Sequence, residues 1–282
     1  MRLWEAVFLA ILGLVYLPAL LGMAQVWREV DYYSHGFLVP VVAAWAVAGL
    51  RARLAGAPRA RDRRGLLVIV AALLVYAWGT LTGSVSAAGL ALVATVAGAL
   101  LYLRGTAWLR ILAFPVGFLI FMVPAPGGWV TPVIVKLQLF VSTAAVGLLR
   151  SAGVAVQQAG NVIHLPSGES LFVAEACSGI TSIITLLPLA VFLAYFTERT
   201  LPRRLVLVAA AIPLAMLGNL LRVVVTVVAA RAIGAAAVTT GPVHEWSGIA
   251  VYALACLALL GVGRSMRRLV PPEGKSVALP GA

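Results

Sequence analysis

Charged residues are scarce in this chain of 282 residues, where Asp, Glu, Lys and Arg together make up only 11% of the sequence. An ordinary soluble domain carries roughly a quarter of charged residues, so the composition excludes that class. Hydrophobic residues make up 62%, and the mean hydropathy is +1.05. Because a helix needs about 20 apolar residues to cross a bilayer, the composition predicts an all-α polytopic membrane protein.

Cysteine and histidine are also scarce, at two and three residues. Cys177 and Cys256 are too few for a disulfide framework and form no Cys-x-x-Cys pair. No two of these residues have the close spacing typical of zinc ligands, so we expect neither a metal nor a cofactor. The net charge of +12 would suggest nucleic acid in a soluble chain, but no basic patch interleaved with aromatic residues accompanies it. We therefore predict no nucleic-acid partner.

Apolar runs divided by polar or glycine- and proline-rich turns predict about eight transmembrane helices. They lie at 4–24, 36–50, 66–81, 85–103, 111–123, 180–196, 205–230 and 249–262. The interrupted segment 129–150 fits either an interfacial helix or a further partial span, and its composition does not decide between them. We expect one integral membrane domain over 1–265, followed by a short basic cytoplasmic tail at 266–282.

Residues 153–174 break the helical pattern just before the sixth predicted span. Short β-rich stretches at 154–157, 161–165 and 171–174 surround the turn Pro166-Ser167-Gly168-Glu169. They predict a small β-hairpin outside the hydrocarbon layer.

The basic residues indicate an orientation for the chain. With eight spans and both termini in the cytoplasm, most of the 21 lysines and arginines fall on the inside, the densest group being at 51–64. This is the asymmetry that the positive-inside rule describes. The basic loops are also expected to contact anionic lipids of the bilayer. Arg28, Lys136, Arg150 and Arg231 are the cations expected outside.

This orientation brings three reactive side chains to the extracytoplasmic face. Cys177 begins the sixth span at its outer end, where the N–H groups of a helix start favour the thiolate. Arg222 lies far along the seventh span, which starts inside, so a rise of about 1.5 Å per residue places it in the outer leaflet. His244 lies in the last outer loop, 231–248. An ionisable residue inside a span indicates a functional site.

Each of these residues also has a structural alternative. A lone cysteine is often a small apolar core residue, which fits Cys256 within the eighth span. Arg222 could extend towards lipid headgroups, and His244 could be a solvated loop residue. Further residues expected to bind substrate or support the site are Asn219, Ser178, Gly179, His35, Glu175 and Glu245. Of these, His35 could equally be an interfacial anchor, and each glutamate a solvated loop charge.

Several strings of residues, in this order, resemble the exosortase/archaeosortase family of polytopic membrane transpeptidases. They are Tyr33 to Pro40, Phe114-Pro115, Met122 to Pro126, Ala176-Cys177-Ser178-Gly179-Ile180, Ala211-Ile212-Pro213, Asn219-Leu220-Leu221-Arg222 and His244. The similarity runs from about 31 to 250. One departure is Thr181, where many relatives have an arginine.

The resemblance implies a function and roles for three residues. It implies that the protein cuts membrane proteins with carboxy-terminal sorting signals, such as the PEP-CTERM type, which consist of a short motif, a hydrophobic span and a basic cluster. Cutting would occur at the outer face of the prokaryotic plasma (inner) membrane, with transfer to an unknown acceptor nucleophile in systems that make extracellular polysaccharide. Cys177 would be the nucleophile, with Arg222 and His244 as its partners.

The chemistry of the residues agrees with such an enzyme but leaves alternatives open. Covalent cleavage needs a nucleophile, a proton shuttle and a positive group near the oxyanion, which Cys177, His244 and Arg222 would supply. Either Arg222 or His244 could lie nearer the sulfur, and either water or an amine could be the acceptor. Two other classes remain: a transporter or flippase of an envelope or exopolysaccharide export system, and a structural subunit of an export complex.

Overall fold

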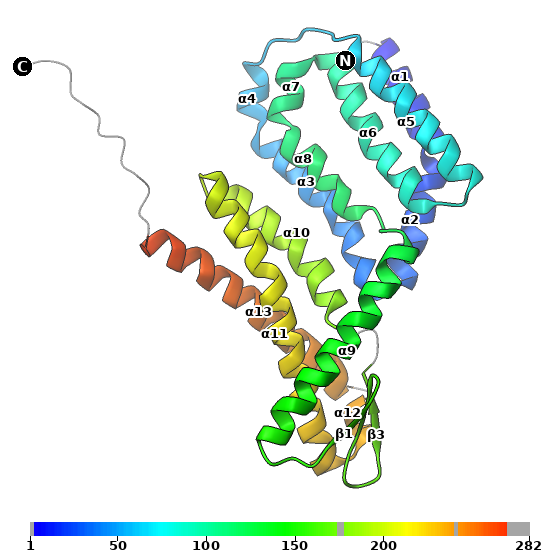
Figure 1. Ribbon diagram of the computed structural model, residues 1–282. Coiled ribbons are helices and arrows are strands. Elements are labelled where there is room, and N and C mark those ends of the chain that lie inside the picture. Colours follow the sequence, from blue (N-terminus) through cyan, green and yellow to red (C-terminus); the bar gives the residue numbers. More distant parts are fainter. Residues whose placement is uncertain (1–2, 174–177, 240–241, 270–282) are drawn as a thin grey trace, which may run out of the picture. The chain divides into compact units, whose positions relative to one another are not determined.

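The computed structural model describes residues 3–173, 178–239 and 242–269, without the side chains of 239–245 and 269. Its helices are α1 (Leu3–Val15), α2 (Leu17–Glu29), η1 (Asp31–Phe37), α3 (Leu38–Gly49), α4 (Arg51–Ala55), α5 (Arg64–Leu81), α6 (Val85–Arg104), α7 (Thr106–Ile111), α8 (Ala113–Phe118), η2 (Leu119–Met122), α9 (Gly127–Ser151), α10 (Ile180–Thr197), α11 (Leu201–Ile233), α12 (Ala235–Thr239) and α13 (Pro242–Leu269), where η marks a 3₁₀ helix. The strands are β1 (Gln157–Ala159), β2 (Val162–His164) and β3 (Ser170–Phe172) (Figure 1). The predicted mostly helical structure is confirmed.

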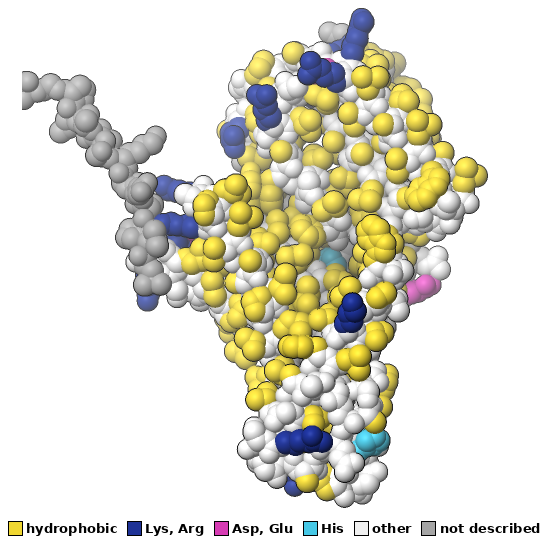
Figure 2. Space-filling model, in the orientation of Figure 1, with side chains coloured by type: hydrophobic (Ala, Val, Ile, Leu, Met, Phe, Trp, Pro, Cys, Tyr) yellow, Lys and Arg dark blue, Asp and Glu magenta, His cyan; other side chains and the backbone are white. Residues whose placement is uncertain are grey.

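The chain divides into two compact units, which we call unit 1 (1–133) and unit 2 (134–282) and describe separately. The prediction of one membrane domain over 1–265 stays a prediction. Of the predicted tail at 266–282, residues 270–282 lie outside the described part of the chain. Hydrophobic side chains cover most of the helical surface seen in Figure 2, as expected for helices that contact lipid.

Within the described residues, six helices are long and apolar enough to cross a membrane, and α1 with α2 makes a seventh if that pair is one span. The predicted count of eight is therefore not confirmed. The six are α5, α6, α9, α10, α11 and the Trp246–Arg268 part of α13. The second and fifth predicted spans correspond to short helices, α3 with 12 residues and the stretch Ala113–Met122. The interrupted segment 129–150 forms α9, which has 25 residues.

The first predicted span is bent. α1 and α2 meet at Tyr16 with an angle of 50°. Pro18 lies at the start of α2, and its ring removes an N–H donor and clashes with the preceding helical turn, which accounts for the bend.

α5 and α6 form the helical hairpin that the sequence predicts. The turn contains Gly83 at a φ of 68°, and the Ser84 hydroxyl caps α6 by accepting a hydrogen bond from the Ala87 N–H at 3.3 Å. The helices approach closely at Gly65, where an added Cβ would lie 2.4 Å from the Tyr102 nitrogen. Small residues at such contacts are typical of membrane helix pairs.

A three-stranded antiparallel sheet, ordered β1-β2-β3, replaces the predicted hairpin in unit 2. β2 pairs on both sides, since Ile163 lies opposite Gln158 and opposite Leu171. The turn at 166–169 returns the chain for the third strand, with Gly168 at a φ of 87°. β1 begins at Gln157, so the predicted strand at 154–157 is shifted towards the carboxy terminus.

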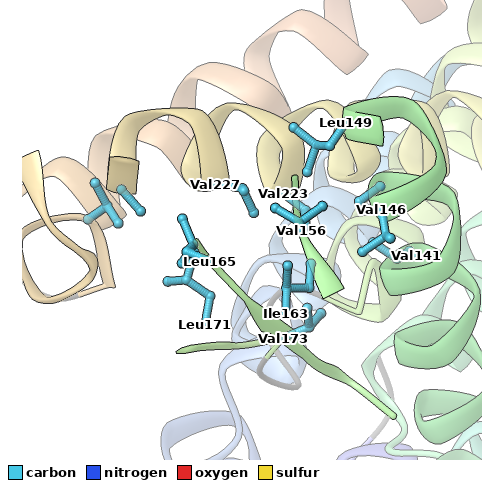
Figure 3. Close-up of a cluster of buried hydrophobic side chains, with 13 residues drawn as sticks. Val141, Val146, Leu149, Val156, Ile163, Leu165, Leu171, Val173, Val223 and Val227 are labelled. Carbon is cyan, nitrogen blue, oxygen red and sulfur yellow. The ribbon is translucent and has the colours of Figure 1, made fainter. Parts of the chain in front are cut away.

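One face of the sheet is buried against α9 and α11 (Figure 3). The cluster joins Ile163, Leu165, Leu171 and Val173 of the sheet region to Val141, Val146 and Leu149 of α9 and Val223 and Val227 of α11. An open sheet edge leaves backbone groups that only water or protein can satisfy, so we expect this end of unit 2 to lie outside the hydrocarbon layer.

α11 is longer than the predicted seventh span. Its 33 residues rise about 50 Å, against a hydrocarbon thickness of about 30 Å. α12 and α13 follow closely, so the prediction of a loop over 231–248 was wrong. The Ala235 N–H at the start of α12 donates to Oε1 of Glu169 at 3.4 Å, which ties the turn of the sheet to this helix.

α10, α11 and α13 share a second apolar core in unit 2. Its fully buried residues include Leu186, Ala211 and Leu259, and Cys256 packs against it from α13. Cys256 therefore has the packing position that the sequence predicts for it.

A buried ion pair closes the end of this core. Glu198, 2% exposed, follows α10, and Arg267 of α13 donates to its Oε1. Arg204 of α11 donates from Nε to the Glu198 backbone oxygen at 2.9 Å. The connection between α10 and α11 is thus attached to the end of α13.

We expect Arg267→Ala to lower the thermal stability of the purified protein by about 5 °C. The substitution leaves the buried Glu198 carboxylate without its cation. Breaking a fully buried ion pair lowers the free energy of unfolding by about 3–5 kcal/mol. We expect about 2 kcal/mol here, because the Arg267 side chain is 40% exposed. Arg264→Ala, at an exposed position on the same helix, is the matched control. An equal loss in both variants would contradict the pairing.

Candidate active site

The start of α10 follows directly on the segment that carries the predicted nucleophile. Cys177 and Glu175 lie outside the described residues, and Ser178 is the described residue nearest to Cys177 in the chain. Ser178 is fully buried, and its hydroxyl accepts a hydrogen bond from the Ile180 N–H at 3.2 Å. Gly179 precedes the helix with a φ of 92°, a conformation that favours glycine.

Asn219 of α11 packs against this helix start. It is 1% exposed, and a Cβ atom placed on Gly179 would lie 3.4 Å from its Nδ2. The Sδ atom of Met216, one turn earlier, would be 3.5 Å away. Glycine at 179 is therefore favoured by its backbone conformation, and both side chains lie at van der Waals distance from it. The structure brings together three of the predicted supporting residues, Ser178, Gly179 and Asn219.

Arg222 lies one turn after Asn219 on α11 and is directed to α13. A Cβ atom placed on Gly248 would be 3.4 Å from both Cζ and Nη2 of Arg222 and 3.5 Å from Nη1. The Nε atom is buried. The guanidinium thus packs on a neighbouring helix of the same unit, which disfavours the alternative in which it extends to lipid headgroups.

His244 belongs to the first turn of α13, not to a loop. Its backbone is helical, whereas its side chain and that of Glu245 lie outside the described part of the chain. Residues four apart share one face of a helix, so position 244 lies one turn before Gly248, on the face that Arg222 contacts. The predicted partnership of Arg222 and His244 stays a prediction, since the His244 side chain lies outside the described residues.

Gln138 is a residue near the site that the sequence did not single out. It is 8% exposed on α9 and donates from Nε2 to the Val173 oxygen at 3.1 Å. The Val173 N–H donates to the Asn161 oxygen at 2.9 Å. Both backbone groups of the last described residue before the Cys177 segment are therefore held. The sequence feature that could have identified Gln138 is an amide side chain in the middle of an apolar helix of 25 residues.

His35 lies in unit 1, where α2 and η1 hold η2 and the chain that follows it. Its Nε2 donates to the Phe121 oxygen at 3.1 Å, Trp27 donates to the Met122 oxygen at 2.8 Å, and the Tyr33 hydroxyl accepts from the Ala125 N–H at 2.9 Å. Burial lowers the pKa of His35, although backbone hydrogen bonds act in the opposite direction. His35 thus contributes a hydrogen bond to the packing of unit 1, and its role in a substrate site stays a prediction.

No group of three His, Cys, Asp or Glu side chains that could hold a metal ion occurs among the described residues. Apart from the segment that carries Cys177, the candidate site in unit 2 contains the guanidinium of Arg222 and the buried amide of Asn219, both on α11. These groups are suited to stabilising an anion and to positioning backbone.

The family model for the transmembrane exosortases (Exosortase_EpsH) matches residues 27–261. The chain belongs to the transmembrane exosortase family. Neither the curated proteins nor the solved structures contain a match to it. The matched segment includes Cys177, Arg222 and His244, and it covers all six membrane-spanning candidates of this exosortase at least in part.

Proposed function

We propose that this exosortase is a cysteine transpeptidase that cleaves carboxy-terminal sorting signals at the extracytoplasmic face of a prokaryotic inner membrane. One observation carries the proposal: a single helix, α11, packs Asn219 on the helix start beside the Cys177 segment and Arg222 on the first turns of α13, where His244 lies. The family match and the membrane-spanning helices agree with this role.

In the proposed reaction, the Cys177 thiolate attacks the scissile carbonyl carbon and forms a tetrahedral oxyanion. Arg222 stabilises that charge. The C–N bond then breaks, the leaving amine takes a proton from His244, and a thioester to Cys177 remains. An acceptor amine, which passes a proton to His244, displaces the thiolate and forms a new amide. If water is the acceptor, the product is a free carboxylate.

The substrates in this proposal are membrane proteins whose carboxy terminus carries a motif, an apolar span and a basic cluster. After cleavage, the span and the basic cluster remain in the membrane, and the new carboxyl end passes to the acceptor. The family resemblance implies the sorting signals and the acceptor. It also implies the biological setting, in which the processed proteins belong to systems that make extracellular polysaccharide.

The two cysteines allow a direct test of the nucleophile. Cys256→Ser leaves Cys177 as the only thiol, and Cys177→Ser leaves Cys256. We expect a membrane-impermeant maleimide, added outside intact cells, to label the first variant and not the second. Labelling at pH 7 should slow about tenfold when His244→Ala or Arg222→Gln is added, because cationic neighbours favour the reactive thiolate.

Labelling only after membrane permeabilisation would contradict the orientation. Labelling from outside at the rate of an ordinary thiol, unaffected by both substitutions, would contradict an activated nucleophile and favour a transporter or a structural subunit. Arg231→Gln, at an exposed position in the last turn of α11, is the matched control for loss of a positive charge.

A further inference from the structure

Unit 1 contains a cavity of about 410 Å³ that has no part in the proposed reaction. α1, α6 and α7 line it, so all its walls belong to one unit. Its volume lies within the range of about 300–1,000 Å³ that is typical of small-molecule sites. Leu9 and Val96 on its walls are 41% and 37% exposed, so the cavity, which we call the α1–α6 slot, opens towards surrounding lipid.

The deep part of the slot is apolar and its polar groups are satisfied. Tyr16 and Thr95, both buried, share a hydrogen bond of 2.7 Å between their hydroxyls. From Thr95 to Arg104 the slot follows α6 over about 13 Å, and Leu103 lies near its mouth. A chain of methylene groups fits such a wall, whereas a polar ligand would leave its own groups unpaired there.

The mouth of the slot is positively charged. Arg104 lines it and donates from both terminal nitrogens to Glu5, at 3.2 and 3.1 Å. Arg61 lies 4.0 Å from the same carboxylate, and Arg59 lies 5.6 Å from the centroid of the Trp108 ring. Glu5 thus faces two guanidinium groups, and with Arg59 at the Trp108 ring these four charged side chains carry a net charge of +2. Arginine side chains gather at this end of unit 1, near α4 and α7 (Figure 2).

Trp108 adds a hydrogen-bond donor at the mouth. Its ring lines the slot, and its Nε1 atom is buried without a hydrogen-bond partner in the part of the chain that the structure describes. Buried donors are rarely left unsatisfied, so an oxygen acceptor beside this ring would complete the site. Ester and phosphate oxygens are acceptors that accompany an acyl chain.

We propose that the α1–α6 slot binds one anionic glycerophospholipid, with an acyl chain between α1 and α6 and the phosphate at Arg59 and Arg61. The apolar walls select a lipid over a free phosphate, and the excess of positive charge selects an anionic over a zwitterionic headgroup. The predicted orientation places this end of unit 1 in the cytoplasmic leaflet. α1 precedes the residues that the family model matches, so four of the twelve residues that line the slot lie outside that segment.

Native mass spectrometry of the protein in a non-ionic detergent tests the headgroup. We expect the first molecule of phosphatidylglycerol to bind at least about tenfold more tightly than phosphatidylcholine. Arg59→Gln with Arg61→Gln should remove about tenfold to thirtyfold of that affinity. Arg51→Gln with Arg53→Gln removes the same charge from the same basic region and should keep the preference. Equal losses in the two double variants would overturn the site in favour of diffuse attraction.

A second variant tests the slot itself. A Cβ atom on Gly13 would have no heavy atom within 4 Å, so Gly13→Leu can fill the slot without a clash. We expect it to lower phosphatidylglycerol affinity at least about tenfold, whereas Gly117→Leu, at an equally open position outside the slot, should not. Unchanged binding by Gly13→Leu, or equal binding of the two lipids by the unaltered protein, would overturn the proposal.

Discussion

Replacing Cys177 by alanine is expected to abolish processing of a carboxy-terminal sorting signal while the protein remains inserted and expressed. Without the sulfur no thioester can form, and removal of a nucleophile typically costs on the order of 10⁴-fold or more in rate. The measurement is the fraction of a co-expressed membrane protein with a motif, a span and a basic cluster that is shortened at its carboxy terminus. Cys177→Ser should be equally inactive, because an unactivated hydroxyl is a weak nucleophile.

Cys256→Ala provides the matched control for this experiment. Cys256 packs at the side of the core between α10, α11 and α13, so its loss should change stability slightly and leave processing intact. Processing by Cys177→Ala above the background of cells without the enzyme would refute the assignment of the nucleophile. Loss of processing in both variants would indicate that the two cysteines are needed for the structure and that Cys177 is not specifically catalytic.

Arg222→Gln is expected to lower the processing rate by about 10²–10³-fold. The substitution removes the guanidinium of α11 that packs on the face of α13 carrying Gly248 and position 244. Loss of one oxyanion-stabilising group typically has an effect of this size. Arg222→Lys keeps the charge but loses the planar arrangement of donors, so it should retain an intermediate rate. Quantification of the shortened product over time gives these rates.

The stability of the variants separates catalysis from packing at Arg222. Glutamine retains part of the side-chain volume, so we expect the thermal transition of Arg222→Gln to stay close to that of the unaltered protein. Arg231→Gln in the last turn of α11 should process normally. If Arg222→Gln unfolds at a much lower temperature and its remaining folded fraction processes normally, Arg222 is a structural residue.

The long apolar helices could be predicted from sequence, since runs such as 66–81 and 85–103 have no competing interpretation. The difficult segments were those in which polar or helix-breaking residues interrupt the run. α9 contains Lys136, Gln138 and Pro132, yet it forms 25 residues of helix, because Gln138 hydrogen-bonds to Val173 and the same helix face continues into the cluster that packs on the sheet. These contacts join residues far apart in the sequence, so the local sequence of α9 does not reveal them.

The roles of the candidate site residues stay predictions, and their geometry could be predicted only within a single helix. The sequence placed Asn219 and Arg222 one turn apart on one helix face, whereas their packing on the start of α10 and on α13 is known from the structure alone. The position of His244 in a helix was not predicted, because Gly241-Pro242 is a turn signal that also begins helices well. The nucleophile segment 174–177 lies outside the described residues, so the role of Cys177 stays a prediction.

The length of α11 sets a requirement on any substrate. Arg222 lies eleven residues before the end of this helix, about 17 Å along its axis, and the neighbouring Val223 already packs in the cluster beneath the sheet. Because we expect that sheet to lie outside the hydrocarbon layer, we also expect Arg222 to lie at the membrane boundary. In the proposed reaction, a bond cut at this level stands clear of the bilayer, so a sorting signal needs a spacer between its cleavage motif and its apolar span. The proposed function therefore predicts that the distance of the motif from the membrane decides which sorting signals are cut.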